Sequence, residues 1–199
     1  MPDTHTPIGL AALEARLRED LEWLGLPVQP WVKPHAYQGQ ALLDVAIIGG
    51  GMAGMAVAAE LQHLGVRAVV FDQAPQGFEG PWATTARMQT LRSPKQLSGP
   101  ALGLPALTFR AWFQAQFGLA EWDALDKIPR LQWAEYLRWY RHVLGLDVRN
   151  LHRVARVQPG AEGRVQLTLD TAQGSLDVNA RHVVLATGRD GLGGPWVPE

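Results

Sequence analysis

The spacing of apolar residues predicts a helix at the start of the chain and a linker after it. Leucines recur at helical intervals between residues 10 and 24, which predicts an amphipathic helix over residues 7–24. Thr6 can cap this helix, and Gly25 with Pro27 can end it. Residues 27–40 contain three prolines and no periodicity, so we expect an extended linker on the surface.

A strand, a glycine turn, a helix and a second strand follow within about thirty residues, the length of a βαβ unit. Residues 42–48 form a short apolar run with β-branched residues at its centre, typical of a buried parallel strand. Residues 52–64 are rich in alanine and have a helical pattern. Residues 66–71 predict the second strand, with Asp72 at its carboxyl end.

The middle of the chain predicts a loop and two helices with aromatic stripes. Residues 73–107 are rich in Pro, Gly, Ser and Thr, and indicate loop with short helical pieces. Helices are predicted over residues 108–117, with Gly118 as the stop, and over residues 129–144. We interpret both aromatic stripes as core packing; the alternative is a wall of a substrate site.

The last third of the chain predicts strands. Residues 147–150 indicate a third strand of the parallel sheet. Strict alternation then predicts an antiparallel meander, whose strands cover residues 153–158, 164–169 and 175–180. A separate buried strand is predicted at residues 182–186, and it leads into Thr187 and Gly188.

Composition excludes several classes of function. The 199 residues are 47% hydrophobic and 19% charged, as in a globular protein. A net charge of −1 gives no reason to expect nucleic acid or an anionic membrane as partner. The longest uncharged stretch is shorter than the ~18 residues of a membrane-spanning helix. The first residues lack the pattern of a secretory signal, so we expect a cytoplasmic protein.

Cysteine and histidine usage narrows the chemistry further. The chain has no cysteine, which excludes disulfides and thiol nucleophiles and counts against a dithiol flavoprotein reductase. The six histidines are scattered without the spacing of metal ligands, so no metal site is expected.

The turn after the first strand of the βαβ unit has the pattern GxGxxG at residues 49–54. Gly49 permits a tight turn, Gly51 has no Cβ to block a diphosphate, and Gly54 lets the helix pack closely on the strand. The free N–H groups at the helix N-terminus carry roughly half a unit of positive charge and favour an anion. This turn therefore predicts a dinucleotide, without any lysine or arginine.

Asp72 lies 18 residues after Gly54, at the tip of the second strand. A carboxylate at this point can accept hydrogen bonds from both ribose hydroxyls of an adenosine, and it repels a 2′-phosphate. The site therefore suits FAD or NAD better than NADP. The alternative is that Asp72 only caps a turn.

With these elements in order, residues 43–199 resemble the N-terminal FAD-binding part of flavin-dependent monooxygenases of the flavin-containing and Baeyer–Villiger group. The motifs are GxGxxG continued to Ala58, Asp72, the segment 80–82 (Gly-Pro-Trp) and the segment 185–188 (Leu-Ala-Thr-Gly). That family more often has Glu in place of Asp72, and Gly-Gly or Gly-Thr before the tryptophan.

The resemblance implies roles for four more residues. Trp82 and Arg87 would lie near the flavin ring, Val154 would contact the adenine through its backbone, and Thr187 would mark the return of the chain beneath the cofactor. Their alternatives are a core tryptophan, a surface arginine, a plain strand residue and a strand-end turn. The full set of candidate cofactor-binding residues is Gly49, Gly51, Met52, Ala53, Gly54, Asp72, Gln73, Trp82, Arg87, Val154 and Thr187. No catalytic residue is named, because the cofactor carries the chemistry.

Two family motifs are absent from the sequence. No second GxGxxG for NADPH follows Gly54, since Gly191 and Gly193 lack the third glycine, and no FxGxxxH segment occurs. We therefore expect a fragment or truncated product, with the NADPH site outside this chain.

The resulting expectation is an α/β protein with a Rossmann-like parallel sheet, a helical insertion and a small antiparallel β-meander. Residues 1–41 would be the N-terminal helix and linker. Residues 42–199 would be an incomplete FAD-binding domain, with the insertion at about 83–145 and the meander at about 153–180.

The expected function is the FAD-binding portion of an NAD(P)H-dependent monooxygenase that inserts one oxygen atom into a small organic substrate. Two alternatives stay open: an NAD-dependent dehydrogenase with a single Rossmann fold, and a catalytically silent truncated protein. A simple dehydrogenase should continue with alternating strands and helices, so the predicted meander counts against the first alternative. The sequence leaves a homo-oligomer open.

Overall fold

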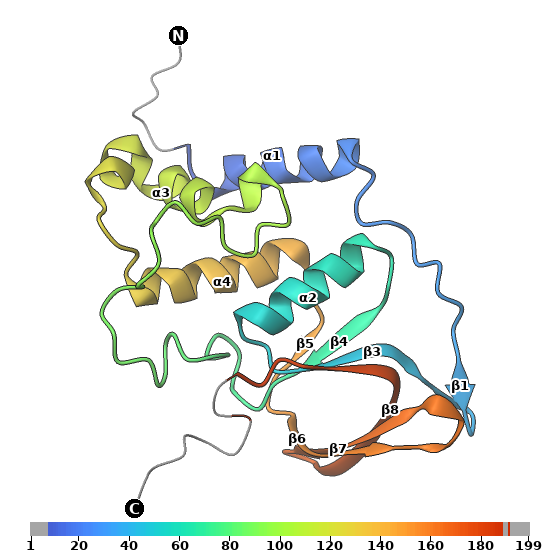
Figure 1. Cartoon of the computed structure of the whole chain (residues 1–199). Helices are drawn as coiled ribbons and strands as arrows, with labels where there is room; N and C mark the ends of the chain where they lie inside the picture. Colours follow the sequence, from blue (N-terminus) through green and yellow to red (C-terminus); the bar gives the residue numbers. More distant parts are fainter. Residues whose placement is uncertain (1–7, 189–190, 192–199) are drawn as a thin grey trace, which may run out of the picture. The chain divides into compact units, whose positions relative to one another are not determined.

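The computed structural model describes residues 8–188 and residue 191, and the chain forms two compact units (Figure 1). One unit, called the helical unit below, contains Met1–Pro27 and Thr85–Gly145. The other, called the sheet unit, contains Val28–Thr84 and Leu146–Glu199. The N-terminal helix therefore groups with the helical insertion, whereas the linker groups with the sheet. Each unit is described by itself below.

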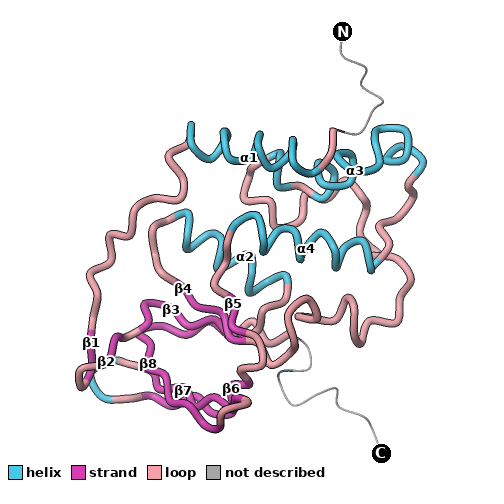
Figure 2. The backbone as a smooth tube through the Cα atoms, turned by 180° about the vertical axis from the view of Figure 1, so that it is seen from behind, coloured by secondary structure: helices cyan, strands magenta, loops and turns pink. Residues whose placement is uncertain are grey.

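The sheet unit has a six-stranded sheet in the order β5-β4-β3-β8-β7-β6 (Figure 2). Strands β3, β4 and β5 and the last part of β8 are parallel, and β6, β7 and the first part of β8 are antiparallel. The elements are β3 Leu43–Ile48, α2 Met52–His63, β4 Ala68–Phe71, β5 Val148–Arg149, β6 Arg153–Pro159, β7 Val165–Thr171 and β8 Gly174–Leu185. The predicted α/β class and Rossmann-like topology with a meander are confirmed.

The sheet unit has two layers, the parallel strands β3–β5 and the antiparallel meander. Strand β8 runs through both layers, so the prediction of two separate strands at its position is wrong. Ala180 pairs with Val165 of β7 and also with Leu43 of β3. Val178 and Ala180 pack on the core from the meander, and Val183 packs on it from the parallel sheet. The residues of β8 that face the core thus have even numbers in the meander and an odd number in the parallel layer. Because the hydrophobic alternation shifts by one residue at this point, the sequence pattern of β8 resembles two separate strands.

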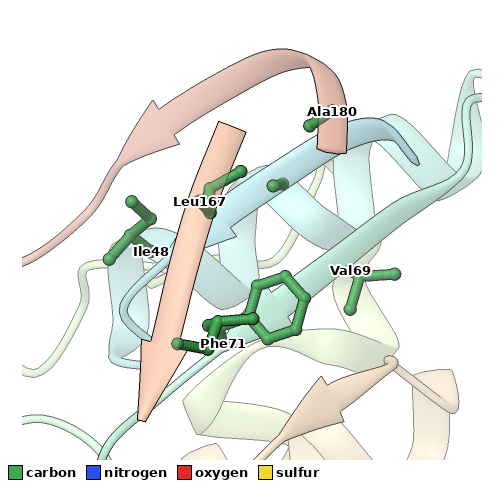
Figure 3. Close-up of a cluster of buried hydrophobic side chains, with 7 residues drawn as sticks. Ile48, Val69, Phe71, Leu167 and Ala180 are labelled. Carbon is green, nitrogen blue, oxygen red and sulfur yellow. The ribbon is translucent and has the colours of Figure 1, made fainter. Parts of the chain in front are cut away.

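The core of the sheet unit lies between the parallel strands and the meander. Ile48 of β3 and Phe71 of β4 meet Leu167 of β7 in one buried cluster (Figure 3). On the other face of β3 and β4 lies α2 (Figure 1), whose small buried residues Ala58 and Ala59 permit close packing. Residues 45 and 47 are also buried, so both faces of β3 are covered, as the apolar residues at 45–48 predict.

The linker contains a short hairpin that the sequence analysis missed, so its description as extended throughout is wrong. Strands β1 (Ala36–Tyr37) and β2 (Gln40–Ala41) pair antiparallel across Gln38 and Gly39. Both turn residues have positive φ, 50° and 77°, as a two-residue hairpin turn of the primed type requires. The Tyr37 ring lies 3.9 Å from the Arg164 guanidinium and attaches the hairpin to the meander.

The helical unit contains α1 (Leu10–Trp23), η1 (Pro105–Leu107), α3 (Phe109–Ala124) and α4 (Arg130–Leu144). Helix α1 begins three residues later than predicted, after Gly9, and the expected cap at Thr6 lies outside the described residues. Gly118 breaks α3 as predicted, with φ 85°, but the prediction that the helix ends there is wrong, because a second helical piece continues to Ala124.

The aromatic stripes of α3 and α4 form the core of the helical unit, as the sequence analysis predicts. Phe109 and Tyr136 are fully buried, and their rings meet edge to face at 5.6 Å. The Tyr136 hydroxyl donates a hydrogen bond of 2.7 Å to the Leu107 carbonyl oxygen. Burial raises the pKa of Tyr136 far above its usual value, so the phenol stays protonated and remains a donor. No helix among the described residues is long and apolar enough to cross a membrane.

His63, at the end of α2, gives the sheet unit a sensitivity to acid. Burial lowers the pKa of His63 below its usual 6.5, and the nearby Glu60 only partly offsets this effect. The folded chain then binds fewer protons than the unfolded chain, so stability falls as pH decreases from about 6.5 through the lowered pKa. Above about 6.5 both states are neutral, and the effect vanishes.

We therefore expect His63→Gln to lose less stability between about pH 7.5 and pH 5 than the unsubstituted chain does. Urea unfolding at both pH values measures the difference. His142→Gln, at an exposed position, is the control and should follow the unsubstituted chain. Equal acid sensitivity with and without His63 would contradict this assignment.

Candidate functional site

The turn between β3 and α2 is fixed by close packing of its main chain. Gly49 has φ 105°, and its N–H donates to the Phe71 carbonyl oxygen at 2.9 Å. A Cβ on Gly49 would strike the Ala186 carbonyl oxygen, and a Cβ on Gly54 would strike the Gly49 carbonyl oxygen. Both glycines are therefore required by the crossing of β3, α2 and the end of β8, as expected for a Rossmann turn.

Helix α2 begins at Met52, as predicted, and its first N–H groups face no capping side chain among the described residues. Gly51 occupies the N-cap position without a side chain, and the first turn has no acidic residue. Met52 and Ala53 are exposed. Because α2 spans 12 residues, its N-terminus carries the partial positive charge of a full helix. Within residues 8–188, only main-chain atoms of Gly80 lie within 4 Å of a Cβ placed on Gly51, so no side chain of this part of the chain fills the turn.

Asp72 is buried at the end of β4, and its carboxylate holds two main-chain N–H groups. One oxygen accepts from Gly50 at 2.6 Å, and the other accepts from Ala74 at 2.7 Å. The bond to Ala74 is the turn cap that the sequence analysis kept as the alternative role. A carboxylate has about four acceptor positions, so two remain for other donors. The bond to Gly50 also fixes the glycine turn itself.

The loop after β4 returns to the glycine turn at Gly80. A Cβ on Gly51 would lie 3.5 Å from the Gly80 Cα, and a Cβ on Gly80 would lie 3.3 Å from the Gly51 Cα. Two segments of bare main chain therefore border the beginning of α2. This surface fits a diphosphate, because side chains that would fill it are missing from both segments. Trp82, two residues further on, is half-buried.

The other predicted residues are spread over the chain. Thr187 follows β8 beside the glycine turn, where its N would lie 3.3 Å from a Cβ on Gly49. Val154 lies in β6 next to an irregularity in the pairing with β7, between Val154 and Arg156, which releases backbone groups from the ladder. Gln73 is exposed beside Asp72. Arg87 is exposed and belongs to the helical unit, so its expected place near the flavin ring stays a prediction.

Three residues of the site were missed by the sequence analysis: Gly50, Glu79 and Asn150. Gly50 is an unspecified position of GxGxxG, but its N–H is bound by Asp72. Glu79 directly precedes the Gly-Pro-Trp segment, a position that could have marked it. Asn150 follows β5, and no local pattern distinguishes it. Among the described residues, no group of three His, Asp or Glu side chains could hold a metal ion.

Comparison with known proteins agrees with this geometry. A family model described as FAD-NAD(P)-binding matches residues 46–190. The chain is 49% identical over 194 residues to an FAD-dependent urate hydroxylase of Xanthomonas campestris pv. campestris, covering 96% of this chain and 40% of the relative. The chain therefore spans about two fifths of the length of that relative.

Solved structures support the same fold. A flavin-containing monooxygenase from Stenotrophomonas maltophilia matches with a TM-score of 0.60 and 25% identity, over 79% of this chain and 41% of that chain. An ornithine hydroxylase from Pseudomonas aeruginosa matches with a TM-score of 0.65 over 79% of this chain and 40% of that chain; at 19% identity it shows the fold alone. The expected resemblance to flavin monooxygenases is confirmed.

Proposed function

Because the chain belongs to the FAD-NAD(P)-binding family, we propose that it is the FAD-binding portion of an NAD(P)H-dependent flavoprotein hydroxylase. The observation that carries this proposal is the uncapped N-terminus of α2, bordered by Gly51 and Gly80 and followed by the carboxylate of Asp72. The meander on β3 and β4 distinguishes the chain from a dehydrogenase of alternating strands and helices.

Different groups of the chain would bind the diphosphate and the ribose of FAD. The N–H groups of Met52, Ala53 and Gly54 would hold the diphosphate, and the two remaining acceptor positions of Asp72 would hold the ribose hydroxyls. When bound, FAD supplies the transfer of reducing equivalents from NAD(P)H and the activation of oxygen. The chain contributes orientation and anion binding, and no side chain of the turn is proposed as a nucleophile.

We propose urate or a closely related purine as the substrate of the whole protein, on the strength of the 49% identity to a urate hydroxylase. One oxygen atom would enter this small organic substrate, and NADPH would bind outside the present chain. The cytoplasmic location expected from the sequence stays a prediction.

Retained cofactor tests the binding half of this proposal. The purified chain is mixed with FAD, passed through a desalting column and analysed for flavin absorbance, with NAD as the competing ligand. We expect about one FAD per chain and no displacement by NAD. A colourless protein that binds NAD instead would support the dehydrogenase alternative. In the protein at the length of its relatives, urate should accelerate NAD(P)H oxidation, and no response to urate would remove the substrate assignment.

Asp72→Ala should weaken FAD binding and also lower the stability of the cofactor-free chain. Each lost hydrogen bond to a charged acceptor typically contributes about 1.5 to 3 kcal/mol, so the dissociation constant should rise roughly tenfold or more. Isothermal titration with FAD measures the first effect, and urea unfolding measures the second. A lower stability with an unchanged FAD affinity would leave Asp72 only its bonds to Gly50 and Ala74.

A further inference from the structure

Glu79 lies against the glycine turn, and both of its carboxylate oxygens are engaged. A Cβ on Gly50 would lie 3.2 Å from the Glu79 Cγ, so the side chain runs directly beside the turn. Its Oε2 accepts from the Gly77 N–H at 2.8 Å, and its Oε1 accepts from the Asn150 side-chain amide at 2.7 Å. Glu79 thus joins its own loop to the end of β5.

Asn150 holds the same loop at a second point. Its side-chain amide also donates to the Ala74 carbonyl oxygen at 3.1 Å, and the Leu151 N–H donates to that oxygen at 3.2 Å. The loop from residue 74 to residue 80 is therefore bound to the segment after β5 near its beginning and near its end. Asp72 adds the bond to the Ala74 N–H at 2.7 Å.

Gly80 directly follows Glu79 in the loop, and it borders the beginning of α2 beside Gly51. A carboxylate close to a diphosphate repels it, so Glu79 is unsuited to be an anion ligand itself. Its two accepted hydrogen bonds instead explain why an acidic residue stands here. An amide of the same shape offers one acceptor and one donor, and the donor would face either the Gly77 N–H or the Asn150 amide.

We propose that Glu79, together with Asn150, is a positioning residue that seats Gly80 against Gly51 and so sets the affinity of the site for the diphosphate of its dinucleotide. This inference rests on the proposed function, and it adds a pair of residues that act through main chain rather than by touching the cofactor. Because the pair acts as a unit, removal of either member releases the same loop.

Binding measurements on four variants and on the unsubstituted chain test the pair. Glu79→Gln and Asn150→Ala should each weaken FAD roughly tenfold, and the double variant should lose little more than either single one. Glu135→Gln, on the exposed face of α4, is the matched control and should bind FAD as the unsubstituted chain does. Additive losses in the double variant would overturn the coupling.

A second pair of ligands separates positioning from general destabilisation. ADP spans the diphosphate surface and AMP carries only one phosphate, so Glu79→Gln should reduce the ratio of ADP affinity to AMP affinity severalfold. A variant that is merely less stable would lose both affinities equally, and that result would overturn the proposal.

Hydrogen exchange of the cofactor-free chain provides the structural control. The amide of Gly77 should exchange faster in Glu79→Gln and in Asn150→Ala, because the loop loses its attachment. Unchanged exchange overturns the inference even if FAD affinity falls. An unsubstituted chain that binds neither FAD nor ADP overturns the proposed function itself, whereas normal FAD binding in all variants overturns only the role of Glu79 and Asn150.

Discussion

Gly51→Val is expected to abolish FAD binding and to leave the chain folded. The backbone of Gly51 is extended, with φ −68° and ψ −176°, so a β-branched residue meets no backbone strain. A Cβ alone would make an ordinary contact of 3.5 Å with Gly80. The two methyl groups of valine would occupy the bare surface at the beginning of α2. We expect at least roughly a 100-fold loss of affinity, about 2.7 kcal/mol.

Titration with FAD and circular dichroism together check this prediction, the first for binding and the second for the fold. Gly51→Ala is the graded control and should lose less affinity, because its single methyl group fits beside Gly80. If Gly51→Val retained FAD, the diphosphate would have to lie elsewhere, and the assignment of the turn would fail.

Gly54→Ala should destabilise the chain, although alanine is the better helix former. Helix propensity alone predicts a gain of about 1 kcal/mol for this exchange. The new Cβ, however, would strike the main-chain carbonyl oxygen of Gly49, which cannot rotate away as a side chain could. Overpacking of this kind costs about 1 to 3 kcal/mol or more, so steric repulsion exceeds the gain in propensity.

Urea unfolding of the cofactor-free chain gives the sign directly. Ala56→Gly, in the same helix, is the matched control, and it should lose about 1 kcal/mol by propensity alone. A chain made more stable by Gly54→Ala would show that α2 does not pack on the turn as described.

The sequence predicts the parts of the site that depend on local pattern. The strand, glycine turn and helix around Gly49 and Gly54 lie within one short segment, and each residue type there has one steric task. Asp72 is predictable because a parallel strand carries it to the same edge of the sheet. The buried aromatic residues of α3 and α4 are equally local, since helical spacing places them on one face.

The missed parts depend on contacts between distant segments. Glu79 and Asn150 are 71 residues apart, and no local pattern shows that their side chains meet. The sequence does not predict the continuation of α3 beyond Gly118 for a related reason. A glycine marks a break in the helix, but it does not indicate whether the chain then turns away or forms another helical piece. The hairpin in the linker depends on only four paired residues, too few to give a pattern.

The sharing of one strand between two layers restricts how this domain can change in length. Along β8, Val178 and Ala180 point into the core from one layer, and Val183 points into it from the other. Removing or adding one residue between Ala180 and Val183 would move every following side chain of β8 to the opposite face of the parallel layer. Homologous sequences should therefore vary around this crossing by substitution or by pairs of residues, while the turns at either end of the meander vary freely in length.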